Sequence, residues 1–450
     1  MRHIQLALVG ILVLISLLWI LAEPGFLKVS GLFPIRTLAV QYTGVLAIAA
    51  MSVAMMLALR PRWPERWMGG LDKMYRLHKW LGVTALIVAI LHWLWSRGPK
   101  WAVGWGLLER PARGPRLPIE NPIEAFLLGL RGTAEDIGEW AFYVVVALIL
   151  LALIRVFPYR WFYKTHRVLA VAYLALVFHT VVLIRFSDWI TPLGLAMAVL
   201  LSGGTFAAII VLLRRVGRAR QVTGRIAELN YYPGVKSLET TIDLAAGWPG
   251  HRAGQFAFAM SDAAEGAHAY TIASDWQPDR PRITFVTKAL GDHTSRLRER
   301  LRVGQEVRVE GPYGCFTFDD DCTHQIWVGG GIGITPFIAR MKHLALCAAA
   351  PDWPEGQKVD LFHTTSDVDA AALARLDADA KAAGARLHLL ISARDGRLTG
   401  ARIREAVPNW REASIWFCGP AEFGAALKRD FASHGFPAEQ RFHQEFFDMR

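Results

Sequence analysis

Long apolar runs fill the first half of the chain, and the second half has none of comparable length. Six of these runs can cross a bilayer, whose hydrocarbon core takes about 20 residues of helix. They lie at residues 4–22, 38–59, 75–95, 140–157, 161–184 and 190–213. A signal peptide is the alternative for the first run, but no small-residue cleavage site follows it. The pattern therefore predicts a six-helix transmembrane bundle.

After Arg220 the pattern changes to short alternating strands with turn residues between them. These strands are predicted at residues 221–232, 237–244, 255–260, 268–274, 282–289 and 306–312. Six such strands suggest a small antiparallel β-barrel. From Gln325 onward strands alternate with helices, which implies a doubly wound α/β fold with a parallel sheet. We therefore expect a membrane domain over 1–218, a barrel over 219–324 and an α/β domain over 325–450.

Basic residues give the spans an orientation. The formal net charge is +11, and the basic residues cluster beside the apolar runs, where they set membrane topology rather than bind nucleic acid. They fill the second and fourth connections and follow the last span. By the positive-inside rule that side is cytoplasmic, with both termini and the whole second half. The long segment 96–138 then lies outside. We expect a multi-pass protein of the plasma (inner) membrane.

Cysteine usage fits a reducing cytoplasm. All four cysteines lie in the second half, and they show no paired C-x-x-C spacing. Neither a disulfide framework nor a zinc site is indicated. They are Cys315, Cys322, Cys347 and Cys418.

Four histidines fall inside two spans, His78 and His92 in the third and His166 and His179 in the fifth. Ionisable residues at membrane depth usually serve a function, and neutral imidazole is a standard axial ligand of haem iron. The two separations correspond to roughly 21 Å and roughly 19.5 Å of helix rise. Two stacked haems could therefore each bind one histidine from each span. Because both spans start inside, His78 would pair with His166 and His92 with His179.

One feature of the fifth span does not fit an ideal helix. Thirteen residues leave its two histidines roughly 140° short of the same face, so we expect local overwinding, a bend or oblique ligands. The alternative is four separate histidines, each hydrogen-bonded inside the bundle. Arg76, Lys79 and Arg167 flank the inner histidines. They could pair with haem propionates or act only as positive-inside residues.

Segment 268–274 has features of a flavin site. An aromatic side chain followed by a hydroxyl can cover a flavin ring and hydrogen-bond its nitrogen edge, although such pairs are also ordinary strand content. A glycine turn near residue 291 then leads into a probable helix start, a suitable place for a pyrophosphate. The expected flavin-binding residues are His268, Tyr270, Thr271, Ser274, Gly291, Asp292, His293 and Thr294.

The α/β part opens with an apolar strand, a glycine turn and a helix start, a pattern that brings a pyrophosphate close to backbone amides. A glycine-rich turn is weak evidence alone and stronger after a flavin-type barrel. The expected NAD(P)H-binding residues are Gly329, Gly330, Gly331, Gly333, Thr335, Pro336, Ser392, Arg394, Cys418, Gly419 and Pro420. Arg394 could accommodate a 2′-phosphate and so favour NADPH, whereas Asp367 nearby points toward NADH. A solvated loop position is the alternative for Arg394.

Together these motifs resemble the ferric reductase and NADPH oxidase superfamily, especially its single-chain bacterial members, over essentially the whole chain. The family's membrane signature is two histidine pairs at these spacings. Its flavin motif is typically His-Pro-Phe-Thr, and residues 268–271 keep the aromatic and the hydroxyl. Residues 311–314, 329–336 and 418–420 are similar to its reductase motifs. Residues 442–447 resemble its closing Glu-x-aromatic segment. The resemblance implies FAD, two b-type haems and a flavin-covering aromatic at Phe447, which nicotinamide displaces, with Cys418 nearby.

We expect hydride transfer from NADPH (or NADH) to FAD, then single-electron steps through the inner and outer haems. The acceptor would be dioxygen, giving superoxide, or a ferric chelate. Arg36, on the outer side, could favour an anion at the haem edge, with snorkelling to the headgroups as the alternative. Ser96 stands where some oxidase members carry another histidine, which weakens the oxygen interpretation. The lipid bilayer is an expected partner, and no nucleic acid or obligatory protein partner is evident.

Three alternatives stay open. The chain could be a membrane subunit that hands electrons to a quinone or a partner protein. It could be a haemless transporter with a sensory flavin domain. A haem transport or storage protein is the third, which would not need the C-terminal reductase.

Overall fold

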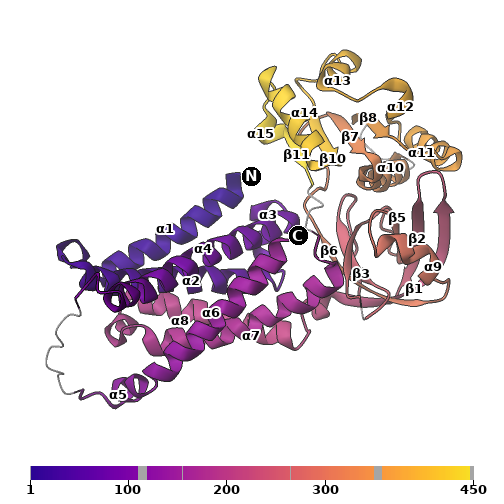
Figure 1. The fold of residues 1–450 in the computed structure, drawn as a ribbon. Helices are drawn as coiled ribbons and strands as arrows, with labels where there is room; N and C mark the ends of the chain where they lie inside the picture. The colour runs from indigo at the N-terminus through magenta and orange to yellow at the C-terminus, as the bar shows by residue number, and fades with distance from the viewer. Residues whose placement is uncertain (1, 110–118, 155, 264, 349–356, 446–450) are drawn as a thin grey trace. The chain divides into compact units, whose positions relative to one another are not determined.

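The computed structural model describes residues 2–109, 119–154, 156–263, 265–348 and 357–445 (Figure 1). The chain divides into two compact units, residues 1–64 with 73–216 and residues 65–72 with 217–449.

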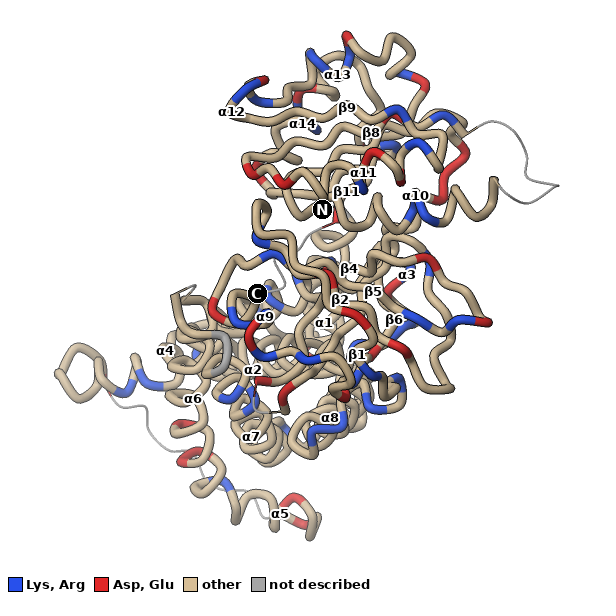
Figure 2. The backbone as a smooth tube through the Cα atoms, turned by 90° about the vertical axis from the view of Figure 1, so that its right-hand side faces the viewer, with Lys and Arg blue, Asp and Glu red and all other residues tan. Residues whose placement is uncertain are grey.

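Six long helices in the first half are long and apolar enough to cross a membrane. They are α1 (Arg2–Ala22), α2 (Leu32–Leu57), α4 (Leu71–Gly104), α6 (Arg131–Leu153), α7 (Tyr159–Leu183) and α8 (Pro192–Leu212). Two short helices, α3 (Trp63–Met68) and α5 (Pro122–Gly129), and the 3₁₀ turns η1 (Phe26–Lys28) and η2 (Phe186–Ile190) connect them. Most charged residues of these helices lie toward the helix ends (Figure 2), as the free-energy penalty of charge in hydrocarbon requires.

Three helices extend clearly beyond the predicted spans, and the first of them, α2, begins six residues early at Leu32. Helix α4 continues to Gly104, and α6 begins at Arg131 and ends at Leu153. An apolar count finds only the part of a helix that faces hydrocarbon, whereas α4 and α6 continue in polar turns. Arg97 of α4 and Glu139 of α6 form an ion pair there. Segment 96–138, expected as a connection, is therefore helical at both ends.

Small residues let the membrane helices pack closely, as is usual where van der Waals contact drives association. A Cβ at Gly204 of α8 would lie 2.0 Å from the Tyr173 hydroxyl of α7. That hydroxyl is 2.8 Å from Oγ of Ser52 in α2. Thr191 caps the start of helix α8, because its side chain accepts the Gly194 N–H. Pro192 is the first residue of the helix.

The second unit begins with the predicted antiparallel barrel. Its strands are β1 (Gln221–Tyr232), β2 (Ser237–Leu244), β3 (Phe256–Met260), β4 (His268–Thr271), β5 (Arg282–Lys288) and β6 (Glu306–Tyr313). They pair in the order β4-β3-β6-β1-β2-β5, and a bridge between Ile272 and Phe285 joins the end of β4 to β5. The turn η4 (Thr294–Arg296) and the single-turn helix α9 (Leu297–Arg300) follow β5. The expected strand bounds hold to within three residues.

The α/β part has a five-stranded sheet in the order β11-β10-β7-β8-β9, and every pair in it is parallel. Its strands are β7 (His324–Gly330), β8 (Lys358–Thr365), β9 (Arg386–Ile391), β10 (Ser414–Cys418) and β11 (Phe442–Gln444). The helical elements are η5 (Gly331–Ile334), α10 (Thr335–Ala348), α11 (Ala370–Ala382), α12 (Ser392–Asp395), α13 (Gly400–Ala406), α14 (Ala421–Ser433) and α15 (Ala438–Arg441). The strand order reverses between β7 and β10, the usual position of a ligand in such sheets.

Both faces of this sheet are covered, so its strands are almost continuously apolar. Trp327 and Trp416 point to the face where α10 and α11 pack. Ile326 and Phe417, one position away on the same strands, point to the face of α13 and α14. This alternation is the period-two geometry of a strand.

A buried ion pair joins the barrel to the α/β part. Glu239 of β2 is 5% exposed, and its Oε2 accepts from Arg375 of α11 at 2.5 Å and from the Tyr232 hydroxyl at 3.0 Å. Removing one partner of such a pair leaves a buried charge without compensation.

Arg375→Met should therefore destabilise the module by about 2 kcal/mol and lower its unfolding temperature by roughly 4–8 °C. Adding Glu239→Gln should recover part of that loss. Lys381→Met, which removes an exposed pair with Asp377 in the same helix, is the control and should change little. Equal effects of the two single substitutions in a thermal melt would contradict the prediction.

Candidate functional site

The structure brings together each histidine pair that the spacing predicts. The ring centroids of His78 and His166 are 5.8 Å apart, and those of His92 and His179 are 6.4 Å apart. A metal-bound imidazole nitrogen lies about 2 Å from its ion, and the ring centre about 1 Å further back. Two imidazoles on opposite sides of one iron therefore have centroids about 6 Å apart. Both pairs fit a bis-histidine haem.

Backbone carbonyls determine the tautomer of three of the four rings. Nδ1 of His78 donates to Ala54 O at 2.9 Å, that of His92 to Val40 O at 3.0 Å, and that of His179 to Ala134 O at 2.7 Å. Because a carbonyl only accepts, each Nδ1 must carry the proton. Nε2 is then left with a free lone pair, as iron ligation requires.

His166 differs from the other three ligand candidates. Its Nδ1 is buried and has no hydrogen-bond partner among the described residues. Its ring instead stacks on Phe162, at a centroid distance of 5.0 Å. Helix α7 is continuous from Tyr159 to Leu183. The ring planes cross at 62° in the inner pair and at 84° in the outer pair.

Arg36 is bound to the helix that carries His92. Its Nε donates to Trp95 O at 3.1 Å and its Nη2 to Ser96 O at 2.9 Å. Pro99 lies inside α4 and has no N–H, so the Trp95 carbonyl lacks its usual donor four residues ahead. Arg36 supplies that missing donor, a role that our sequence analysis missed because Pro99 lay beyond the predicted span 75–95. Among the residues that flank the inner histidines, Arg167 lies over the Tyr163 ring at 4.8 Å.

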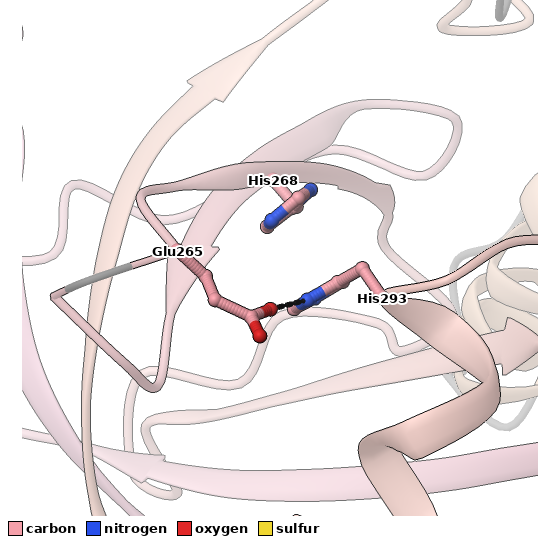
Figure 3. A group of neighbouring side chains, drawn as sticks. All are labelled: Glu265, His268 and His293. Atoms are coloured by element: carbon pink, nitrogen blue, oxygen red, sulfur yellow. Dashed lines mark hydrogen bonds and ion pairs between the residues drawn. The ribbon is translucent and has the colours of Figure 1, made fainter. Parts of the chain in front are cut away.

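Two predicted flavin residues belong to a hydrogen-bonded chain in the barrel. The Tyr270 hydroxyl lies 2.8 Å from Nε2 of His293. The Nδ1 of His293 bonds the Glu265 carboxylate, which also binds Arg300. The His268 ring stacks on that of His293, with centroids 3.6 Å apart and planes 10° apart (Figure 3). Sequence reasoning missed Glu265, which lies in a connection far along the chain from His293.

Ligand atoms of Glu265, His268 and His293 all lie within 4.8 Å of one another, so a metal ion has to be considered. A metal lies close to the plane of each imidazole that binds it, and two parallel stacked rings share no such point. The Glu265 carboxylate is moreover bound by Arg300. We therefore assign the group to a hydrogen-bond network rather than to a metal.

Electrostatics in this network follow from its contacts. Burial, with a smaller contribution from the neighbouring His293, lowers the pKa of His268 to about 4. Burial alone would raise the pKa of Glu265, but hydrogen bonds from His293 and Arg300 outweigh it and hold this pKa below its usual range. His268 is therefore neutral and Glu265 ionised at neutral pH.

The remaining flavin candidates differ in their partners, since the buried Thr271 hydroxyl has none among the described residues, whereas those of Ser274 and Thr294 are hydrogen-bonded. Thr271 is buried at the end of β4, and Ser274 Oγ accepts the Thr284 N–H at 3.1 Å. Thr294 Oγ1 accepts the N–H groups of Leu290 and Gly291. The turn at Gly291 and Asp292 leads into the short helical elements η4 and α9, where a helix start was expected. A pyrophosphate at this turn stays a prediction.

The two predicted nucleotide turns touch at the carboxyl edge of the parallel sheet. Gly329 and Gly330 end β7, and η5 leads directly into α10 with Thr335 and Pro336 at its start. A Cβ at Gly333 would lie 2.2 Å from Cys418 O, and one at Gly330 would lie 3.0 Å from Pro420 and 3.6 Å from Gly419. Gly331 has a φ of +56°, which glycine adopts without strain.

The other nucleotide candidates differ in their exposure and partners. Cys418 is fully buried, and burial raises the pKa of its thiol well above the ordinary value, so it is a neutral thiol. Ser392 and Arg394 form α12 after β9, and the exposed Arg394 guanidinium pairs with Asp395 at 2.9 Å. Asp367 after β8 pairs with Lys288 at 2.5 Å. Phe447 lies outside the described residues.

Comparison with known proteins indicates which class of protein this chain is similar to. Residues 43–177 match the family described as "Ferric reductase like transmembrane component". The flavohemoprotein of Pseudomonas putida is 27% identical over 206 residues, which are 41% of this chain and 48% of that protein. The NADPH oxidoreductase of Mycobacterium tuberculosis is 32% identical over 174 residues, which are 37% of this chain and 43% of that protein. The chain thus spans less than half the length of these curated relatives.

Among solved structures, the flavohemoglobin from Malassezia yamatoensis aligns with 92% of this chain and 98% of its own, at 14% identity and a TM-score of 0.48. The matched family range contains His78, His92 and His166, and His179 lies two residues beyond its end. The fold and the site define a multi-pass membrane protein that joins six apolar helices to an antiparallel barrel and a parallel α/β sheet. Residues 43–177 of its membrane half are similar to the ferric reductase-like transmembrane component.

Glu265→Gln should weaken the network around His293 in a pH-dependent way. Because folding lowers the pKa of Glu265, the ionised carboxylate stabilises the folded state at neutral pH. That contribution is lost as the pH falls through the lowered pKa. Wild type should melt roughly 2–4 °C above the variant at neutral pH, and the two should converge below about pH 4.3.

The measurement is tryptophan fluorescence during heating at a series of pH values. Glu228→Gln, which removes an exposed pair with Arg282, is the matched control. A difference between wild type and Glu265→Gln that stays constant down to the lowest pH would refute the assignment of the ion pair.

Proposed function

We propose that this protein transfers electrons from NADPH, through FAD and two b-type haems, across the plasma (inner) membrane to dioxygen. Both termini and the reductase module would lie in the cytoplasm, as the basic connections favour. The observation that carries the proposal is the pairing of four imidazoles at centroid distances of 5.8 Å and 6.4 Å inside the membrane domain. A set of separately hydrogen-bonded histidines has no reason to meet in two such pairs.

The chain's own groups prepare the sites that this function needs. Ala54, Val40 and Ala134 hold the Nδ1 protons of three ligands, so that Nε2 of each carries no proton and is available to iron. When bound, a flavin takes two electrons together from a nicotinamide and releases them singly, which haem iron requires. The Tyr270 hydroxyl, in turn, is held by His293 and Glu265.

NADPH is the proposed donor rather than NADH. Arg394 is exposed after the third strand of the sheet, where a 2′-phosphate could bind. Asp367, the residue that favoured NADH, pairs with Lys288 of the barrel. The contact of Gly333 with Cys418 O brings together the two turns between which a nicotinamide would lie.

The decisive experiment is anaerobic addition of NADPH to purified protein, followed by admission of dioxygen or ferric citrate. We expect low-spin haem bands that become reduced by NADPH and are reoxidised by dioxygen, with superoxide formed. Ferric-chelate reduction that is insensitive to superoxide dismutase, with negligible oxygen uptake, would indicate a ferric reductase on the same scaffold. Reoxidation by quinone alone would indicate an electron-transfer subunit, and a spectrum without haem bands a haemless transporter.

His78→Ala and His166→Ala should each remove the inner haem and stop electron flow across the membrane, because each leaves that iron with one protein ligand. Flavin reduction by NADPH should stay intact, since it needs only the second unit. The measurements are haem content per chain and stopped-flow absorbance of the flavin. Two low-spin haems in either variant would disprove the pairing.

Arg36→Met tests the acceptor side. If its charge favours the forming superoxide anion, the rate of superoxide production should fall on the order of fivefold, which corresponds to about 1 kcal/mol. Haem content should stay unchanged. Adding Pro99→Ala returns an N–H to the Trp95 carbonyl without returning the charge.

The double variant Arg36→Met/Pro99→Ala therefore separates the two roles of Arg36. A rate that stays low supports the electrostatic role. A rate restored by Pro99→Ala would show that Arg36 acts only by completing helix α4. Superoxide is measured as dismutase-sensitive cytochrome c reduction.

A further inference from the structure

Two glycines of the membrane domain lie directly against the outer histidines. A Cβ at Gly138 of α6 would lie 1.9 Å from Nδ1 and 2.4 Å from Cε1 of His179. A Cβ at Gly44 of α2 would lie 3.1 Å from Cε1 and 3.3 Å from Nδ1 of His92. A Cβ at Gly138 would overlap the His179 ring, so the ring or the helix would have to move. A Cβ at Gly44 would be in tight contact with the His92 ring. Only glycine leaves the His179 ring where it is.

Each glycine stands one helical turn after the carbonyl that holds the same ring. Val40 precedes Gly44 by four residues, and Ala134 precedes Gly138 by four. In an α-helix the carbonyl of residue i accepts the N–H of residue i+4, and the two residues share a face. The carbonyl has a second lone pair, which the imidazole Nδ1–H uses. The missing side chain at i+4 gives the ring access to that lone pair.

The inner pair is not built in this way. His78 bonds the carbonyl of Ala54, and the residue four positions on is Ala58, the C-cap of α2. The Nδ1 of His166 has no partner among the described residues. The glycine-and-carbonyl arrangement therefore occurs on both ligands of the outer site and, in the described part of the chain, on neither ligand of the inner one.

We infer that Gly44 and Gly138 are positioning residues for the outer haem ligands. The inference rests on the proposed bis-histidine haems. Each glycine lets its helix hold an imidazole by Nδ1, and this bond sets the ring orientation and increases the basicity of Nε2. A methyl group at either position displaces the ring from its carbonyl. The ligand then binds iron more weakly, and the reduction potential of the outer haem rises.

A graded alanine series tests the inference. Gly138→Ala should lose the outer haem, so that haem content falls from two to one per chain. Gly44→Ala should keep both haems, with shifted low-spin electron paramagnetic resonance signals and a higher midpoint potential for one of them. Gly132→Ala, in the same helix as Gly138 but with nothing within 4 Å of its Cβ, is the control and should behave as wild type. Because alanine favours helix over glycine, none of these effects can come from a weakened helix.

A second comparison separates crowding of the ring from general misfolding. In a His179→Ala background, the atoms that the new methyl group would meet are gone. Gly138→Ala should then have no more effect than Gly132→Ala on inner-haem content and on melting temperature. A further loss in that background would show that Gly138 matters for folding rather than for His179, and would overturn the inference.

The outcomes distinguish this inference from the proposed function. Wild-type protein with two haems and a Gly138→Ala variant with the same two unshifted signals would overturn the inference and leave the function standing. Wild-type protein without haem would remove both. If Gly138→Ala fails to accumulate, Gly44→Ala and the His179→Ala background decide: unshifted signals in Gly44→Ala would overturn the inference.

Discussion

The membrane half depends on one interaction, the hydrogen bond between an imidazole Nδ1 and a helix carbonyl. A polar ring in hydrocarbon must be satisfied internally, and a helix offers few acceptors because its carbonyls already bind its own N–H groups. Second lone pairs on Ala54, Val40 and Ala134 supply the acceptors. The consequence goes beyond stability, because the same bond leaves Nε2 unprotonated and free to bind a metal ion. Packing and ligand chemistry therefore impose the same arrangement on α2, α4, α6 and α7.

The second unit solves a different problem, which is to bring two turns together at one sheet edge. Parallel pairing of β7 with β10 aligns their carboxyl ends, and glycine at position 333 allows direct contact with the Cys418 carbonyl. In the barrel the aromatic position is Tyr270, and its hydroxyl is bound by a histidine with a carboxylate behind it. Tyr270 has a hydroxyl that the phenylalanine of the typical His-Pro-Phe-Thr motif lacks, and His293 is the partner of this hydroxyl. The two residues therefore belong to one local network.

Much of this architecture could be predicted from the sequence because it is periodic. Alternation and turn residues locate the barrel strands closely. The two histidines of each helix are separated by a similar length of helix, 14 and 13 residues, and this match predicts which rings meet. Helix ends were less predictable, since α4 and α6 continue in polar turns that an apolar pattern does not detect. Apart from the histidine pairs, contacts between residues distant in sequence could not be predicted. Arg36 with Trp95 and Glu265 with His293 depend on how helices and loops pack.

The two histidine pairs are not equivalent, and the difference bears on electron flow. Both outer rings are held by a carbonyl and a glycine, whereas the inner pair has one ring held and one resting on Phe162. A ligand that donates its Nδ1 proton is more basic and favours oxidised iron. With the two haems proposed above, the outer site should therefore have the lower reduction potential of the two. An electron there would be held weakly, which suits the proposed transfer to an acceptor outside the membrane.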